Sequence, residues 1–183
     1  MAASTLSPFK EALSKERRPL ILLSFVVLMG SMFAGTFTPA DPRLLEELNR
    51  LVQEAQEGGY AAVFVNNAII ALTFFVPLLG LGSGFSASFT TGAAMSALAQ
   101  EAGMNAQILF LTTMIMPHAV IEFGAYSLAL AENLVIMQKV LSRKSIRAEI
   151  GPLVSTVLLT LGLLILAAIV EIITTQILAG LVI

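Results

Sequence analysis

The chain of 183 residues is 57% hydrophobic and only 12% charged, and its mean hydropathy is +0.89. Soluble domains carry about 25% charged residues, so this composition excludes a soluble protein and predicts an integral membrane protein with one membrane domain. The net charge of −2 argues against nucleic-acid binding, and the absence of cysteine excludes disulfides, thiolate metal sites and cysteine nucleophiles.

The first element is a polar N-terminal segment, residues 1–19, which precedes an apolar run. Its basic residues are Lys10, Lys15, Arg17 and Arg18. The mixture of basic and apolar residues in this segment predicts an interfacial helix. The run at 20–37 has no convincing secretory cleavage site and would cover roughly 27 Å as a helix, so we expect it to be the first membrane span.

Residues 41–57 are predicted to form an amphipathic surface helix. Asp41 is suited to the N-cap and Pro42 to the first helical position, and leucines recur at helical spacing between glutamates. Gly58-Gly59 is expected to end this helix. Its apolar face would pack on the membrane or on the spans, and the alternative is a helix that docks a partner or acts as a gate.

Two further spans are predicted at 60–79 and 84–99, and the second of them carries a stripe of small residues. The members of the stripe fall four residues apart: Gly84, Ser88, Gly92 and Ser96. Small residues at this spacing let helix backbones approach closely in lipid. We therefore expect 84–99 to be a packing helix and the chain to form a homodimer.

The apolar run at 106–137 has 32 residues, which is too long for one straight crossing. Pro117 interrupts the run, so the sequence predicts either one kinked helix or two helical segments. A basic loop at 138–151 follows and leads to the last span at 153–177. Pro152 is suited to the first position of that last helix.

Together these elements predict an all-α polytopic membrane bundle of five spans, with a sixth, re-entrant segment at Pro117 as the alternative. The single membrane domain covers residues 20–183. The positive-inside rule places the basic segments 1–19 and 138–151 in the cytoplasm and the acidic helix 41–57 outside. Five crossings of the cell membrane then leave the N-terminus in the cytoplasm and the C-terminus outside.

Polar residues inside the apolar runs are the candidate functional residues. His118 and Glu122 lie four apart, so their side chains would share one helix face. We expect them to converge with residues of other spans in one buried polar cluster, whose other members are Asn66, Asn67 and Glu171. Further candidates on or beside the same face are Tyr126, Glu132 and Asn133. A charged residue at mid-bilayer costs about 2.5–3.5 kcal/mol, so such residues need partners or a function.

Four interpretations of the cluster remain open. It could be a structural set of interhelical hydrogen bonds, or a proton-coupled transport site in which Glu122 or Glu132 titrates. Metal binding by His118 and Glu122 would need one or two additional ligands. An intramembrane hydrolase is disfavoured because no nucleophile motif accompanies the histidine. No cofactor is predicted, and without a phosphate-binding loop any energised process would need a separate ATPase subunit.

Four ordered stretches carry a family resemblance: Phe64-Val65-Asn66-Asn67, the glycine-rich 80–92, Met116-Pro117-His118 with Glu122-Phe123, and Ala168-Ile169-Val170-Glu171. Together they resemble the stage II sporulation protein M family over about residues 20–177. Two departures are Ala119, where the family usually has glycine, and Ala131-Glu132-Asn133, which replaces a glycine-rich stretch. Glu132 therefore inherits no role from the resemblance.

The resemblance implies a multi-pass membrane protein, whose relative in endospore formers acts with peptidoglycan-degrading partners during engulfment. Many relatives in organisms that form no spores share no agreed activity. We therefore expect a non-enzymatic membrane scaffold or assembly component with a membrane or envelope protein as partner. A small-solute or proton-coupled transporter is the alternative, and a metal-binding intramembrane site is the second alternative.

Overall fold

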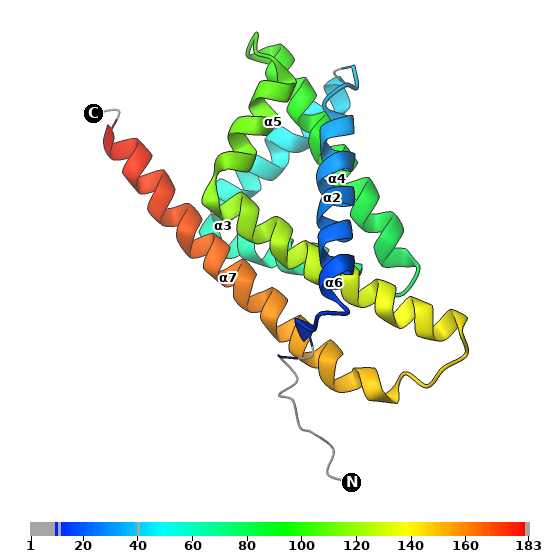
Figure 1. The fold of residues 1–183 in the computed structure, drawn as a ribbon. Coiled ribbons are helices and arrows are strands. Elements are labelled where there is room, and N and C mark those ends of the chain that lie inside the picture. The colour runs from blue at the N-terminus through cyan, green and yellow to red at the C-terminus, as the bar shows by residue number, and fades with distance from the viewer. Residues whose placement is uncertain (1–9, 11, 40, 182–183) are drawn as a thin grey trace.

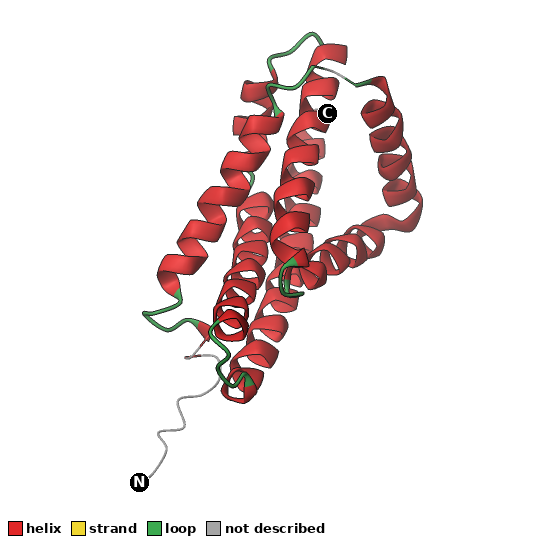
Figure 2. Ribbon diagram, turned by 90° about the vertical axis from the view of Figure 1, so that its right-hand side faces the viewer, coloured by secondary structure: helices red, strands yellow, loops and turns green. Residues whose placement is uncertain are grey.

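The computed structural model describes residue 10 and residues 12–39 and 41–181, and within this part of the chain the regular elements are all helices (Figures 1 and 2). They are α2 (Arg18–Gly35), α3 (Pro42–Phe74), α4 (Leu79–Glu101), α5 (Ala106–Ile115), α6 (Pro117–Leu141), the short 3-10 helix η1 (Arg147–Glu149) and α7 (Ile150–Leu181). The interfacial helix expected within 1–19 falls largely outside the described residues.

Helix α6 lies at the centre of the bundle, where it packs against α2, α3, α4, α5 and α7. Helix α2 packs against α4 and α6, and α6 also packs against α7, which returns beside it after the basic loop (Figure 1). Leu28 and Met32 of α2 meet Phe74 of α3 and Phe123 of α6 in the main apolar core. Burial of these large side chains in one cluster fixes how the helices sit around α6.

Helix α3 is bent into two pieces at Gly59, as Figure 2 shows. The first piece begins as predicted: the Asp41 side chain accepts a hydrogen bond from the Arg43 backbone N–H at 2.9 Å, and Pro42 takes the first turn. Gly59 then adopts φ 61° and ψ −163°, which interrupts the helical geometry. On the apolar face of this piece Leu44 and Leu45 are half-buried, and the side chains further along, from Leu48 to Ala55, lie outside the described ones, so the docking of this face stays a prediction.

Three helices of the described chain are long and apolar enough to cross a membrane: Arg18–Gly35, Pro117–Leu141 and Arg147–Ile177. The apolar helices Ala61–Phe74 and Ala106–Ile115 are shorter. At about 1.5 Å per residue they are roughly 21 and 15 Å long, less than the ~30 Å hydrocarbon core. The coarse architecture of a helical protein with apolar spans is therefore as expected, and the number of five spans stays a prediction.

The interruption predicted at Pro117 is present, and it separates two helices. Met116 has an extended backbone, with φ −66° and ψ 127°, between the end of α5 at Ile115 and the start of α6. The proline ring disfavours helical geometry for the preceding residue and suits the first position of a new helix. Residues 106–137 are thus two segments and not one kinked helix.

The small-residue stripe of α4 is buried inside the chain, where it packs against α2 and, at Gly84, also meets α3 and α6. All four members, Gly84, Ser88, Gly92 and Ser96, are buried. A side chain at Gly92 would collide with the Met32 carbonyl of α2, and the Ser96 hydroxyl donates to the Thr38 carbonyl at 2.7 Å. Because other helices of the same chain already cover this surface, the stripe no longer supports a homodimer, which stays an untested prediction.

Candidate functional site

The candidate site is a polar pocket between α3, α4 and α6. The Asn67 side-chain N–H of α3 donates to a Glu122 carboxylate oxygen of α6 at 2.9 Å. The two residues border a pocket of about 210 Å³, whose lining is Asn66, Asn67, Ile70, Phe74, Ala87, Ser88, Thr91, Glu122, Phe123 and Tyr126. Asn66 and Thr91 are exposed, so the pocket opens at the surface of the bundle.

Tyr126 forms part of the pocket wall, one helical turn after Glu122. Its ring meets Phe74 edge-on at a centroid distance of 5.5 Å and Phe123 at 6.0 Å. Edge-to-face aromatic pairs of this kind add about 0.5–1.5 kcal/mol to the burial of the rings. The aromatic wall therefore gives the polar groups of the pocket a fixed and largely apolar surrounding.

Glu171 and His118, the other two of the five residues that the sequence singled out, do not line this pocket, and the five-residue cluster stays a prediction. Glu171 of α7 lies near enough to Glu122 for the two carboxylates to interact electrostatically. His118 and Glu122 form no hydrogen bond with each other: Asn67 is the partner of Glu122, and the buried Nδ1 of His118 has no hydrogen-bond partner among the described residues. Their spacing placed both side chains on one face of α6, but the donor to Glu122 comes from α3.

The described part of the chain contains no set of side chains that could bind a metal ion. No group of three or more His, Cys, Asp or Glu side chains comes together there in a way that could hold an ion. His118 and Glu122 alone offer at most two ligands, whereas a stable site needs three or four.

Glu132 and Asn133 do not belong to this pocket, although the helical periodicity placed them on nearly the same face of α6 as His118. They lie ten or more residues beyond Glu122, which is about 15 Å along the helix axis. Asn133 instead donates to the Phe74 and Val76 carbonyls, both at 2.7 Å, and so caps the end of α3. Periodicity reports the angle around a helix axis and says nothing about the distance along it.

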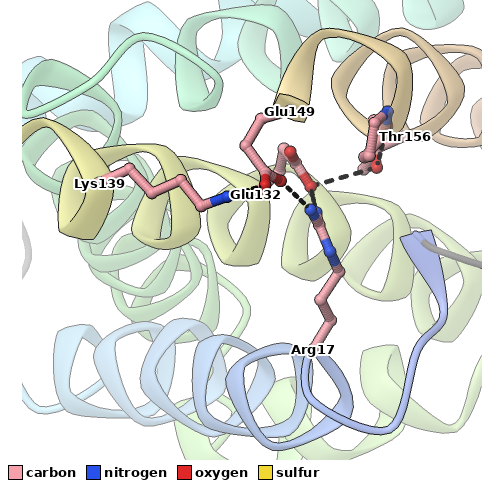
Figure 3. Close-up of polar contacts among 6 residues, drawn as sticks. Arg17, Glu132, Lys139, Glu149 and Thr156 are labelled. Carbon is pink, nitrogen blue, oxygen red and sulfur yellow. Dashed lines mark hydrogen bonds and ion pairs between the residues drawn. The ribbon is translucent and has the colours of Figure 1, made fainter. Parts of the chain in front are cut away.

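Glu132 belongs to a second polar cluster, which the sequence did not predict (Figure 3). We call it the Arg17 cluster; its members are Arg17, Glu132, Lys139, Glu149 and Thr156. The buried Arg17 guanidinium, just before α2, donates to both Glu132 and Glu149, and Lys139 donates to Glu149. The Thr156 hydroxyl of α7 lies 3.4 Å from Glu132. Arg17 and Glu132 are 115 residues apart in the sequence. The only sequence signal for them was that each is a charged residue beside or within an apolar run.

Together the two clusters show what the polar residues of the bundle do in the structure. Buried charges are tolerated in proteins when they are paired, and removal of one partner is costly. The Asn67–Glu122 bond joins α3 to α6, and the Arg17 cluster joins the start of α2 to α6 and to η1. These bonds hold the helices together. The pocket beside Glu122 is in addition a polar surface that a small ligand could reach.

The family comparison can be placed on this geometry. The sequence profile of the family described as stage II sporulation protein M matches residues 20–176, which is most of the chain. The chain belongs to that family. The matched region contains the pocket residues Asn67 and Glu122 as well as Glu171, whereas Arg17 precedes it. The chain matches no curated protein and no solved structure.

Proposed function

We propose that this member of the stage II sporulation protein M family is a non-enzymatic membrane scaffold or assembly component. The observation that supports the proposal is that polar side chains between the helices tie them together. Glu122 is bonded to α3 through Asn67, and Glu132 is bonded to the segment before α2 through Arg17. A bundle tied in this way presents a fixed outer surface, which is what an assembly component needs.

We further propose that the chain crosses the cell membrane five times, through α2, the second piece of α3, α4, the α5–α6 pair and α7. Support for the orientation comes from the Arg17 cluster, which brings the N-terminal segment and the loop after α6 to one end of the bundle. Eight of the ten lysines and arginines lie in these two segments, since only Arg43 and Arg50 lie elsewhere. The positive-inside rule makes that end cytoplasmic and the C-terminal end external.

A small-solute or proton-coupled transporter is the second candidate, and the open pocket is the observation that favours it. Glu122 and Asn67 face a pocket that exposed Asn66 connects to the surface. An ionisable side chain at such a place is the usual mark of an ion or substrate pathway. A transporter would need this carboxylate to exchange a proton or a ligand during each cycle.

Proteoliposomes that enclose a pH-sensitive dye separate the two functions. The scaffold proposal predicts that proton flux into vesicles with the intact protein is no larger than proton flux into vesicles with the Glu122→Gln variant. The amide keeps an oxygen for Asn67 and removes the titratable group, so folding should be retained. Proton flux in the intact protein that the variant abolishes, with circular dichroism unchanged, would establish the transporter instead.

The partner of the scaffold is sought with a photo-crosslinking amino acid in native membranes. Placed at exposed Gln53, in the first piece of α3, it should capture the same membrane or envelope polypeptide in repeated preparations. Placed at Ile69, which is 58% exposed in the apolar second piece, it should capture mainly lipid. Equal and non-specific labelling from both positions would contradict partner docking on residues 41–57.

A further inference from the structure

A second, larger pocket of about 510 Å³ lies where the N-terminal segment meets the end of α6. Its volume falls within the roughly 300–1,000 Å³ that is typical of small-molecule sites. Lys10, Lys15 and Arg17 line it from the N-terminal segment, and Lys139 and Glu149 line it from the other side. The pocket therefore gathers basic residues from both of the basic segments of the chain.

The charges of this pocket favour an anion. Four basic side chains line it against the carboxylates of Glu16 and Glu149. Glu149 is already neutralised, because both Arg17 and Lys139 donate to it. Lys10 and Lys15 form no ion pair with any residue that the structure describes, so their charges are available to a ligand.

The position of the pocket matches the headgroup region of a membrane. Leu20 and Val135 form its apolar side, and the outward-facing residues of α2 become apolar directly beyond it, with Leu22 65% and Leu23 53% exposed. Polar groups that could donate hydrogen bonds, those of Ser14 and Gln138, also line it. Basic pockets between membrane helices at the cytoplasmic side are suited to phosphate-bearing headgroups.

We propose that this pocket binds a phosphate group, with Lys10 and Lys15 as the charged ligands and the Arg17–Glu149–Lys139 ion pairs as its rigid wall. The ion pairs hold the wall in place because they tie the start of α2 to η1 and the end of α6. The proposal goes beyond the scaffold function, since it assigns a ligand to a part of the bundle that the scaffold does not require.

The test is native mass spectrometry of the full chain released from detergent, with phosphatidylglycerol and phosphatidylcholine as probes. One phosphatidylglycerol should bind in preference to phosphatidylcholine. Because a lysine near a membrane surface contributes about fivefold to the binding of an anionic headgroup, Lys10→Gln with Lys15→Gln should weaken it about 25-fold. Sodium phosphate added at matched ionic strength identifies the source: displacement of the lipid shows that free phosphate also fits, and no displacement shows a lipid headgroup site.

The matched control removes two basic residues from the same end of the bundle. Arg143 and Lys144 are exposed in the loop after α6 and do not line the pocket. Arg143→Gln with Lys144→Gln should weaken phosphatidylglycerol binding less than twofold, and Glu16→Gln should strengthen it severalfold because it removes an opposing charge. Equal weakening by the two double variants, or equal binding of the two lipids, would overturn the proposal. Unchanged circular dichroism confirms that each variant is folded.

Discussion

The Asn67 side-chain nitrogen lies 2.9 Å from a carboxylate oxygen of Glu122, to which it donates a hydrogen bond. This bond joins α3 to α6, although the two residues are 55 positions apart in the sequence. It is made at the edge of a pocket, beside the aromatic wall that Tyr126 and Phe123 form. In a bilayer the alternative for both groups is contact with hydrocarbon, so the bond favours the packed bundle over separated helices.

Removal of the amide should destabilise the bundle. Asn67→Leu leaves the Glu122 carboxylate without its donor, and a buried polar group left unsatisfied costs about 1–3 kcal/mol. Unfolding followed in increasing dodecyl sulfate measures the loss. Asn66→Leu is the matched control, because Asn66 is exposed and forms no hydrogen bond with the described residues. A similar loss in both variants would mean that the bond contributes nothing beyond the general effect of the substitution.

Arg17 should be the most costly single basic residue to replace. Arg17→Ala strips Glu132 and Glu149 of their shared partner inside the structure, and a broken buried ion pair costs about 3–5 kcal/mol. Arg18→Ala removes an adjacent exposed arginine and should cost less than about 0.5 kcal/mol. Thermal unfolding of both variants in one detergent compares their stabilities. The double variant Arg17→Ala with Glu132→Gln should recover part of the stability that Arg17→Ala loses. No difference between Arg17→Ala and Arg18→Ala would show that the ion pairs do not stabilise the folded protein.

Two glycines of α4 should respond differently to replacement by alanine. At Gly92 a methyl group would collide with the Met32 backbone of α2, so Gly92→Ala should destabilise the protein by about 1–3 kcal/mol. At Gly82 nothing lies within 4 Å, so Gly82→Ala should be neutral or stabilise the helix by up to about 1 kcal/mol. Unfolding midpoints in dodecyl sulfate measure both effects. A neutral Gly92→Ala would indicate that α2 and α4 pack more loosely than the structure shows.

The bend in α3 should depend on Gly59. Its φ of 61° with ψ −163° is a backbone conformation that alanine adopts only with strain, of the order of 1–3 kcal/mol. Gly59→Ala should therefore change the angle between the two pieces of α3, which spin labels at exposed Arg43 and Ile69 report as a shifted distance distribution. Gly162→Ala, at an open helical position, should leave that distribution unchanged. An unshifted distribution in Gly59→Ala would show that packing, and not the glycine, sets the bend.

Local signals in the sequence predicted most of the helix boundaries. Asp41-Pro42 starts α3, Gly59 interrupts it, and Pro117 separates α5 from α6, because capping groups, glycine and proline act through the backbone of their immediate neighbours. The lengths of the apolar pieces were less well predicted. The span expected at 60–79 ends as a helix at Phe74, since a turn and Pro77 follow.

Partners of the polar residues were harder to predict, because they depend on how helices pack. The pairing of Arg17 with Glu132 spans 115 residues, and nothing near either residue in the sequence points to the other. The small-residue stripe that includes Gly92 correctly indicated close helix packing, but not that α2 of the same chain is the neighbour. The spacing of His118 and Glu122 indicated a shared helix face, but it could not show that the hydrogen-bond partner of Glu122 is Asn67 of another helix.

The central claim is that polar side chains inside this bundle tie its helices together, and a double-mutant cycle on Asn67 and Glu122 tests it most directly. The stabilities of Asn67→Ala, Glu122→Ala and the double variant are measured by dodecyl sulfate unfolding. An interhelical hydrogen bond in a membrane protein predicts a coupling free energy of about 0.5–2 kcal/mol between the two positions. A coupling within error of zero would contradict the account.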